Sequence, residues 1–139
     1  MATMSFYNAF FADAMNKVHN LGSDTLKLAL TNTAPAATHT TLANITQIAA
    51  GNGYTSGGQA LDNVTSTQTS GVYSLVADDE VFTASGGAIA QFQYVVLYNS
   101  TASDKLIGYW DNGTSVDLAD SETFTVTFGS NVLTFQIDS

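Results

Sequence analysis

Short runs of alternating apolar and polar residues, separated by turn residues, make up most of the chain after Gly22 and limit the folds open to it. An apolar residue at every second position places those side chains on one face of a β-strand. We predict strands at residues 24–31, 59–64, 72–77, 81–84, 88–99, 105–110, 122–128 and 132–137. Since no helix-length segments alternate with these strands, the pattern predicts a mainly β fold, an antiparallel β-sandwich or jelly roll.

Turn-forming residues separate the predicted strands. They occur at Ser70-Gly71, Gly86-Gly87, Asp111-Asn112-Gly113 and Gly129-Ser130-Asn131. The last turn joins residues 122–128 to residues 132–137, and in residues 122–128 Phe and Val alternate with Thr. This pair is therefore predicted to be a hairpin. The Ser- and Thr-rich residues 65–70 are predicted to form a mobile loop.

The N-terminal segment has a helical period instead. Apolar residues recur there at three- and four-residue spacing: Tyr7, Phe11, Ala14, Met15 and Val18. We expect Ser5 to be the N-cap and Asn20 or Gly22 to end the helix, while Phe6 and Phe10 widen the apolar face beyond one narrow stripe. The prediction is one domain with two parts: residues 1–22, a helix or arm that packs on the body or a neighbour, and residues 23–139, a β-sandwich.

A second, shorter helix is predicted behind a loop at residues 32–41 that holds the only proline. Leu42, Ile45 and Ile48 lie three residues apart, and Thr40 or Thr41 can cap the first turn. One or two helical turns are expected at residues 42–48.

Positive charge is scarce, because the chain has three lysines, no arginine and twelve acidic residues, with a formal net charge of -9. Binding to nucleic acid needs clustered cations that displace counterions from phosphates, and an anionic membrane surface needs similar clusters. The composition therefore argues against both partners. With only 11% of residues charged, neutral polar side chains must cover most of the exterior. Such surfaces suit packing against other proteins, and they also occur on robust extracellular domains.

No segment shows the basic start and apolar core of a signal peptide or the ~20 apolar residues of a membrane-spanning helix. The chain also lacks cysteine, which leaves its redox compartment open. We expect a soluble protein made in the cytoplasm, which reaches the outside of a cell only as part of a particle.

No recognisable catalytic group emerges from the sequence. The two histidines, His19 and His39, have no placed nucleophile and acid, so both are interpreted as structural or surface residues. The glycines in residues 51–58 lack the spacing and lysine of a phosphate-binding loop, and a glycine turn with Tyr54 fixing it to the core explains them. We therefore expect a protein that is not an enzyme and needs no cofactor.

The densest acidic cluster, Asp78-Asp79-Glu80, leaves two interpretations open. Several carboxylates in one place could bind a hard cation such as calcium, but no known calcium-loop spacing is present. A solvated turn is the preferred interpretation, and no metal ligand is predicted.

Aromatic residues are the remaining candidates for function. Phe92, Tyr94 and Tyr98 lie in predicted strands, where ordinary core and cross-strand packing explains them. Subunit contacts are the alternative for some aromatics, because interfaces are enriched in such residues. The residues predicted for such contacts are Phe6, Phe10, Tyr54, Tyr109 and Trp110.

Several motifs follow one another in a recognisable order. The most specific is Gly51-Asn52-Gly53-Tyr54 followed by residues 57–61, and it comes after a strand and a Thr-rich loop. The other segments are residues 25–31, 93–99, 106–111 and 124–126. Together these motifs resemble a family of small structural proteins of tailed bacteriophages, the capsid decoration or cement proteins. The resemblance implies a virion component with a jelly-roll-like body and no catalytic residues.

Three classes of function follow as hypotheses. In the first, the protein cements the capsid by bridging neighbouring subunits of the major capsid protein, with other copies of itself as further partners in a homo-oligomer on the particle. In the second, it is a tail or fibre module that binds a host-surface glycan or another tail protein. The third, a hydrolase, has no supporting catalytic constellation.

Overall fold

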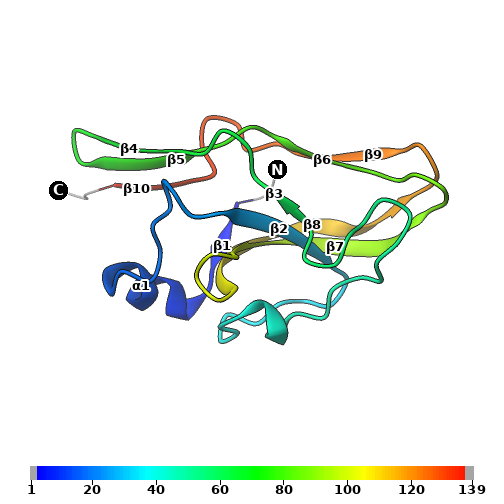
Figure 1. The fold of residues 1–139 in the computed structure, drawn as a ribbon, viewed down its shortest axis with the longest axis horizontal. Helices are drawn as coiled ribbons and strands as arrows, with labels where there is room; N and C mark the ends of the chain where they lie inside the picture. Colours follow the sequence, from blue (N-terminus) through cyan, green and yellow to red (C-terminus); the bar gives the residue numbers. More distant parts are fainter. Residues whose placement is uncertain (1–2, 137–139) are drawn as a thin grey trace.

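A long antiparallel pair, β7 (Ile89–Asn99) and β8 (Lys105–Leu118), forms the centre of the larger sheet of this computed structural model (Figure 1). The strand β2 (Leu26–Thr31) pairs with β7, and the short strand β3 (Gln59–Ala60) pairs with β2. On the other side, β1 (Ser5–Phe6) pairs with β8, so the order is β1-β8-β7-β2-β3. Every pairing in this sheet is antiparallel.

Two smaller sheets form the second layer, over one face of the larger sheet (Figure 1). One has the order β10-β5-β4 and contains β4 (Thr65–Thr69), β5 (Val72–Val76) and β10 (Leu133–Gln136). The other pairs β6 (Glu80–Thr83) with β9 (Thr123–Val126). The prediction of a mainly β fold built from antiparallel sheets is confirmed.

The main core lies between the two layers. Leu28 and Leu30 of β2 and Val95 and Leu97 of β7 face the smaller sheets, and all four are fully buried. Leu75 of the three-stranded sheet is equally buried and belongs to the same cluster. The every-second-residue pattern seen in the sequence thus places these side chains on one face, as strand geometry requires.

The opposite face of the larger sheet is buried as well. Ala29 and Val96 point to this side and are covered by Tyr7 from the N-terminal segment and by Leu42 and Ile45. Leu42 lies in a single 3-10 turn, Leu42–Asn44, where the Asn44 side chain accepts hydrogen bonds from two backbone N–H groups before the turn. The helix predicted at residues 42–48 is therefore only this turn.

The structure describes residues 3–136, and the N-terminal prediction needs correction within them. Ser5 is not an N-cap, because Ser5 and Phe6 pair with β8, and the helix α1 spans only Asn8–Met15. It ends well before Gly22, since Lys17 has a positive φ of 64°. The end of the predicted last strand at Ile137 and the outer limits of both predicted parts lie outside the described residues.

The pairing of the last strands also differs from the prediction. Residues 122–128 and 132–137 do not form a hairpin with each other: β9 pairs with β6, and β10 pairs with β5. The connection between them carries the chain from one small sheet to the other, and Phe128 N–H donates to Asp79 along the way, at 2.9 Å. The alternation of apolar and polar residues predicts these strands but does not predict which strands they pair with.

Two predicted irregular segments are strands. Residues 65–70 are not a mobile loop, because Thr65–Thr69 is β4 and forms a tight hairpin with β5. Asp111-Asn112-Gly113 does not end a strand, because β8 continues to Leu118 through an irregularity in its pairing with β7. The Asp111 carboxylate accepts the Gly113 N–H at 2.7 Å, which stabilises the extra residues as a bulge.

The glycine turn at residues 51–58 is packed tightly against β2, and Tyr54 fixes it to the core as predicted. Tyr54 is 2% exposed, and its hydroxyl accepts the Leu30 N–H at 3.1 Å and donates to Gln47 at 2.7 Å. Gly58 has a φ of +76°, and a Cβ built there would lie 1.6 Å from the backbone oxygen of Leu28. Only glycine allows this approach, which sets up the pairing of β3 with β2.

We predict that Gly58→Ala lowers the free energy of unfolding by about 3 kcal/mol, because it adds overpacking to an unfavourable φ. Gly113→Ala is the matched control, since Gly113 has a similar φ of +86° with nothing within 4 Å of the added Cβ. This control should lose only about 1 kcal/mol. Equal losses in urea denaturation would contradict a special role for the contact with Leu28.

Candidate protein-interaction surface

The five aromatic residues predicted at subunit contacts differ in exposure. Phe10, Tyr54 and Trp110 are buried within the chain, at 1%, 2% and 4% exposure. Phe6 and Tyr109 are partly exposed. The structure therefore gives the first three a role in holding the fold together, and Phe6 connects the core to the surface.

Phe6 and Phe10 belong to an aromatic cluster that joins the N-terminal segment to the three-stranded sheet. The Phe6 ring stacks on Phe10 at 5.5 Å and on Phe135 of β10 at 5.3 Å between centroids. Phe11 lies at the edge of the cluster, 5.6 Å from Phe6 and 6.1 Å from Phe135. Tyr73 of β5 completes it, 6.2 Å from Phe135. Offset and tilted rings at such distances stabilise packing beyond the buried area alone.

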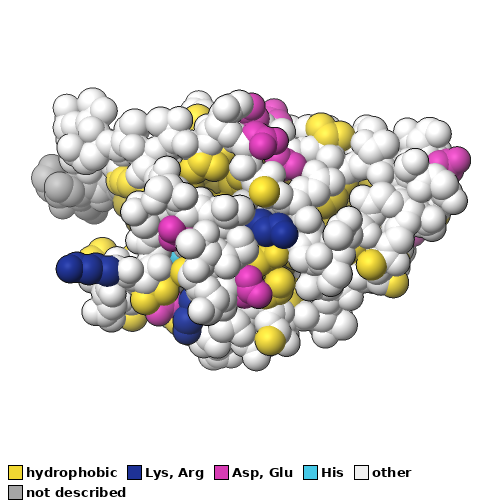
Figure 2. Space-filling view, in the orientation of Figure 1, with side chains coloured by type: hydrophobic (Ala, Val, Ile, Leu, Met, Phe, Trp, Pro, Cys, Tyr) yellow, Lys and Arg dark blue, Asp and Glu magenta, His cyan; other side chains and the backbone are white. Residues whose placement is uncertain are grey.

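An open groove lies beside this cluster, between α1 and the three-stranded sheet, with a volume of about 930 Å³. Its apolar lining comes from Phe10, Ala14, Met15, Leu21, Tyr73 and Phe135. Figure 2 shows hydrophobic side chains at the notch between these two parts, on a face that is otherwise mostly neutral and polar. Met15 is 82% exposed and Phe11 is 48% exposed, so the helix presents large apolar side chains to solvent here.

A smaller hollow of about 430 Å³ lies between the N-terminal segment and residues 127–134. Met4, Phe6, Trp110, Phe128 and Val132 contribute its apolar lining. Trp110 packs against Phe128 with ring centroids 5.8 Å apart. Both hollows thus adjoin the N-terminal segment, which ties the two layers together at this end.

His19 lines the groove and is held by a part-buried polar network. The Asn99 amide nitrogen donates to the Asp24 carboxylate at 2.7 Å and lies 3.0 Å from His19 Nδ1. Because that amide nitrogen can only donate, Nδ1 must accept, and the neutral ring carries its proton on Nε2. Burial lowers the pKa of His19; Asp13 and Asp24 oppose this shift, and Lys105 adds to it. The structure therefore favours uncharged His19.

The lowered pKa of His19 makes stability depend on pH. On acidification the unfolded chain takes up this proton first, near the ordinary histidine pKa of about 6.5, so stability is lost as pH falls below that value. We predict that the free energy of unfolding falls between pH 7.5 and 5.5 more in the wild type than in His19→Gln. Identical pH dependence in the two proteins, measured by urea denaturation, would refute this assignment.

The acidic residues Asp78, Asp79 and Glu80 point to separate partners. Asp78 accepts the Asn63 amide at 2.6 Å, and Asp79 accepts the Phe128 N–H. Glu80 is 6% exposed. With the Gln59 amide oriented so that its nitrogen faces the two nearby acceptors, this nitrogen donates to the Glu80 carboxylate at 2.8 Å and to the Val81 carbonyl at 3.1 Å. Within residues 3–136, no group of three or more His, Cys, Asp or Glu side chains is arranged to hold a metal ion.

Burial raises the pKa of Glu80, and the nearby carboxylates of Asp62 and Asp78 raise it further. The folded state therefore binds this proton more tightly than the unfolded state, and stability is lost as pH rises through the folded pKa. We predict that Glu80→Gln increases the free energy of unfolding at pH 7, with a gain that shrinks as pH falls toward 4.5, the ordinary pKa of the group. A destabilised variant at pH 7 would contradict this.

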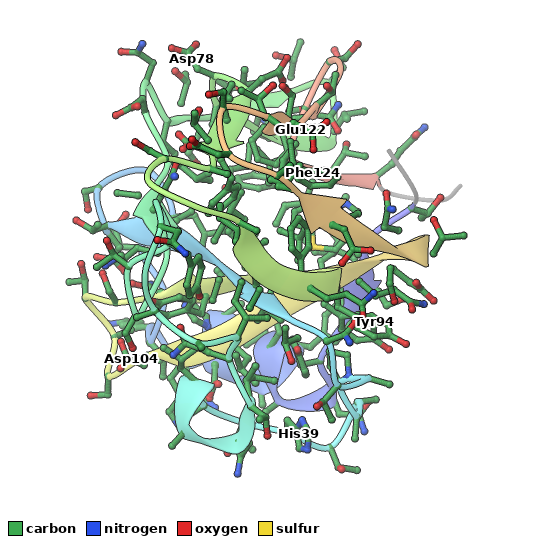
Figure 3. The ribbon with its side chains drawn as sticks, turned by 90° about the vertical axis from the view of Figure 1, so that its right-hand side faces the viewer. His39, Asp78, Tyr94, Asp104, Glu122 and Phe124 are labelled. Carbon is green, nitrogen blue, oxygen red and sulfur yellow. The ribbon has the colours of Figure 1, made fainter. Side chains whose placement is uncertain are left out.

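Neither histidine is hydrogen-bonded to an acidic side chain among the described residues. His39 Nδ1 accepts the Ala36 N–H at 3.2 Å within the loop before the 3-10 turn. Figure 3 shows His39 at the opposite end of the molecule from Asp78 and Glu122. His19 Nδ1 accepts the hydrogen bond from the Asn99 amide. Neither histidine contacts a serine or threonine hydroxyl in the hydrogen bonds of the described residues.

Comparisons with protein families, curated proteins and solved structures found no match for this chain. Among the described residues, no helix is long and apolar enough to cross a membrane.

The sequence does not predict the groove. The helical stripe grouped Phe11 and Met15 with the core face, whereas the structure buries Tyr7 and Phe10 and exposes the other two. Tyr73 and Phe135 carried no signal beyond strand alternation, because only the pairing of β10 with β5 brings them together. The surplus of aromatics around residues 6–11 was the one sequence feature that pointed to this region.

Proposed function

We propose that this chain is a non-enzymatic structural component of a tailed-phage virion, a decoration or cement protein that bridges neighbouring capsid subunits. The observation that carries the proposal is the apolar groove beside α1, with Met15 exposed in its lining and Phe11 exposed on the same helix. The body would be the sandwich or jelly roll that the resemblance implies.

Exposed apolar side chains around a groove support a protein partner. Burying Met15 and the exposed part of Phe11 in an interface would recover the free energy lost by exposing them to water. Methionine adapts its shape easily to a partner, and an aromatic floor such as Tyr73 and Phe135 is typical of the energetically important part of an interface.

The charge distribution supports a partner bound through shape and neutral contacts. With three lysines against twelve acidic residues, copies of this chain repel one another at long range. A capsid lattice brings many copies close together, so contacts have to lie where charge is sparse. The groove meets this condition, since Lys17 is the one charged side chain that lines it.

Repetition would provide the strength of attachment. An ordinary interface buries about 800 Å² on each partner, and a groove of this size accounts for part of that area. A protein that touches two neighbouring subunits gains avidity, because the second contact forms at high effective concentration. Modest individual contacts therefore suffice to cement a symmetric shell.

Cryo-electron microscopy of the source particle tests the location, and rebinding to stripped particles tests the surface. We predict that Met15→Glu weakens rebinding at least tenfold, because the charge must be desolvated in an apolar contact. Val81→Glu is the matched control: Val81 is also an exposed apolar residue, at 45%, but lies in β6 of the two-stranded sheet. Particles without the protein should lose resistance to heat and low salt.

Three results would overturn the proposal: shell density that this chain does not fit, equal rebinding of the two variants, or unchanged resistance of stripped particles. The alternative role, a tail or fibre module, predicts different results. The purified chain would then bind host cells or their polysaccharide, and density for it would lie on the tail.

A further inference from the structure

We propose that β4 is a self-association edge, at which two copies of this chain pair antiparallel about a two-fold axis centred on Thr67. This pairing would extend the three-stranded sheet of each copy into a continuous six-stranded sheet. The inference adds a contact between copies and does not depend on the groove binding a capsid subunit.

The outer edge of β4 is free for pairing. In the order β10-β5-β4, one side of β4 bonds to β5, and alternate backbone N–H and C=O groups on its other side have no strand partner among the described residues. All five of its residues are exposed. Among the edge strands of residues 3–136, it is the longest. In Figure 1 the β4–β5 hairpin reaches one end of the molecule, clear of the larger sheet.

The outer edge of β4 lacks the structural features that normally prevent another strand from pairing with it. Proteins protect free edges with charged residues, proline, bulges or very short strands. The β4 sequence, Thr-Ser-Thr-Gln-Thr, has no charge and no proline, and its register with β5 is regular. The hairpin is also well formed, since Ser70 and Gly71 have positive φ values of 50° and 81°, as a tight two-residue turn requires.

Charge points to a second copy as the occupant. Residues 63–77 contain no charged side chain in a chain whose formal net charge is -9. Two such chains repel each other wherever acidic residues meet, so an uncharged hairpin is the surface on which copies can approach. The part of β8 beyond β1 offers a longer free edge, but it carries Asp111 and Asp117, which disfavour self-pairing.

An antiparallel arrangement makes the edge complementary to itself. With Thr67 on the two-fold axis, Thr67 faces its own equivalent, and Ser66 faces Gln68 of the other copy. The side chains of Thr65, Thr67 and Thr69 lie on the face of the sheet opposite to Leu75 and the core. Pairs of threonines across neighbouring strands are favourable on such a face. Five residues a side bury less than an ordinary interface, so the dimer should be weak in dilute solution and favoured at high local concentration.

Single cysteines test this directly, because the natural chain has none. Directly opposed residues in antiparallel strands have Cα atoms about 4.5–5.5 Å apart, within reach of a disulfide. We predict that under air oxidation purified Thr67→Cys forms a disulfide-linked dimer at least tenfold faster than Thr65→Cys, whose two copies would lie about 14 Å apart across the axis. Thr114→Cys, an exposed position in β8, measures random collision.

A second measurement uses the natural edge without cysteine. Thr67→Lys places two like charges opposite each other on the axis, so its association in sedimentation equilibrium should be at least fivefold weaker than that of the wild type. Equal cross-linking of the three cysteine variants, or unchanged association of Thr67→Lys, would overturn the proposal. Met15→Glu should leave Thr67→Cys cross-linking unchanged, which separates failure of this contact from failure of the capsid contact.

Discussion

The burial of β2, and of residues 95–99 of β7 with residues 106–110 of β8, on both faces is the constraint that organises this molecule. Leu30 and Val95 face one side while Ala29 and Val96 face the other, and all four are fully buried. An antiparallel sheet often leaves one face to solvent, but this one requires two covers. The smaller sheets provide one cover, and the N-terminal segment with the loop around Leu42 provides the other.

The smaller sheets and the N-terminal segment extend beyond the edge of the larger sheet (Figure 1). The helix α1 and the three-stranded sheet both lie at one end of the molecule, where Phe6, Phe10 and Phe135 join them face to face. The groove lies between α1 and the three-stranded sheet, next to the aromatic cluster that connects them. The same geometry leaves β4 without a neighbour on its outer side, so the groove and the free edge have a common origin.

Scarcity of charge gives these two surfaces their chemical character. A protein with so few cations has little means of attracting phosphates, and His19 Nδ1 and the Glu80 carboxylate accept internal hydrogen bonds. What the surface offers a partner is apolar area at the groove and backbone hydrogen bonds at β4. Both proposed contacts are short-ranged, so they would act when copies are already concentrated.

The sequence by itself determined the local features. Alternation identified the antiparallel strands, and Gly51–Gly58 marked a turn that Tyr54 does fix to the core. The tertiary structure alone decided that β9 pairs with β6, that residues 65–69 form a strand, and that Met15 and not Phe10 meets solvent. The reason is physical: periodicity specifies which side chains share a face, whereas strand partners and covered faces depend on contacts between residues far apart in the chain.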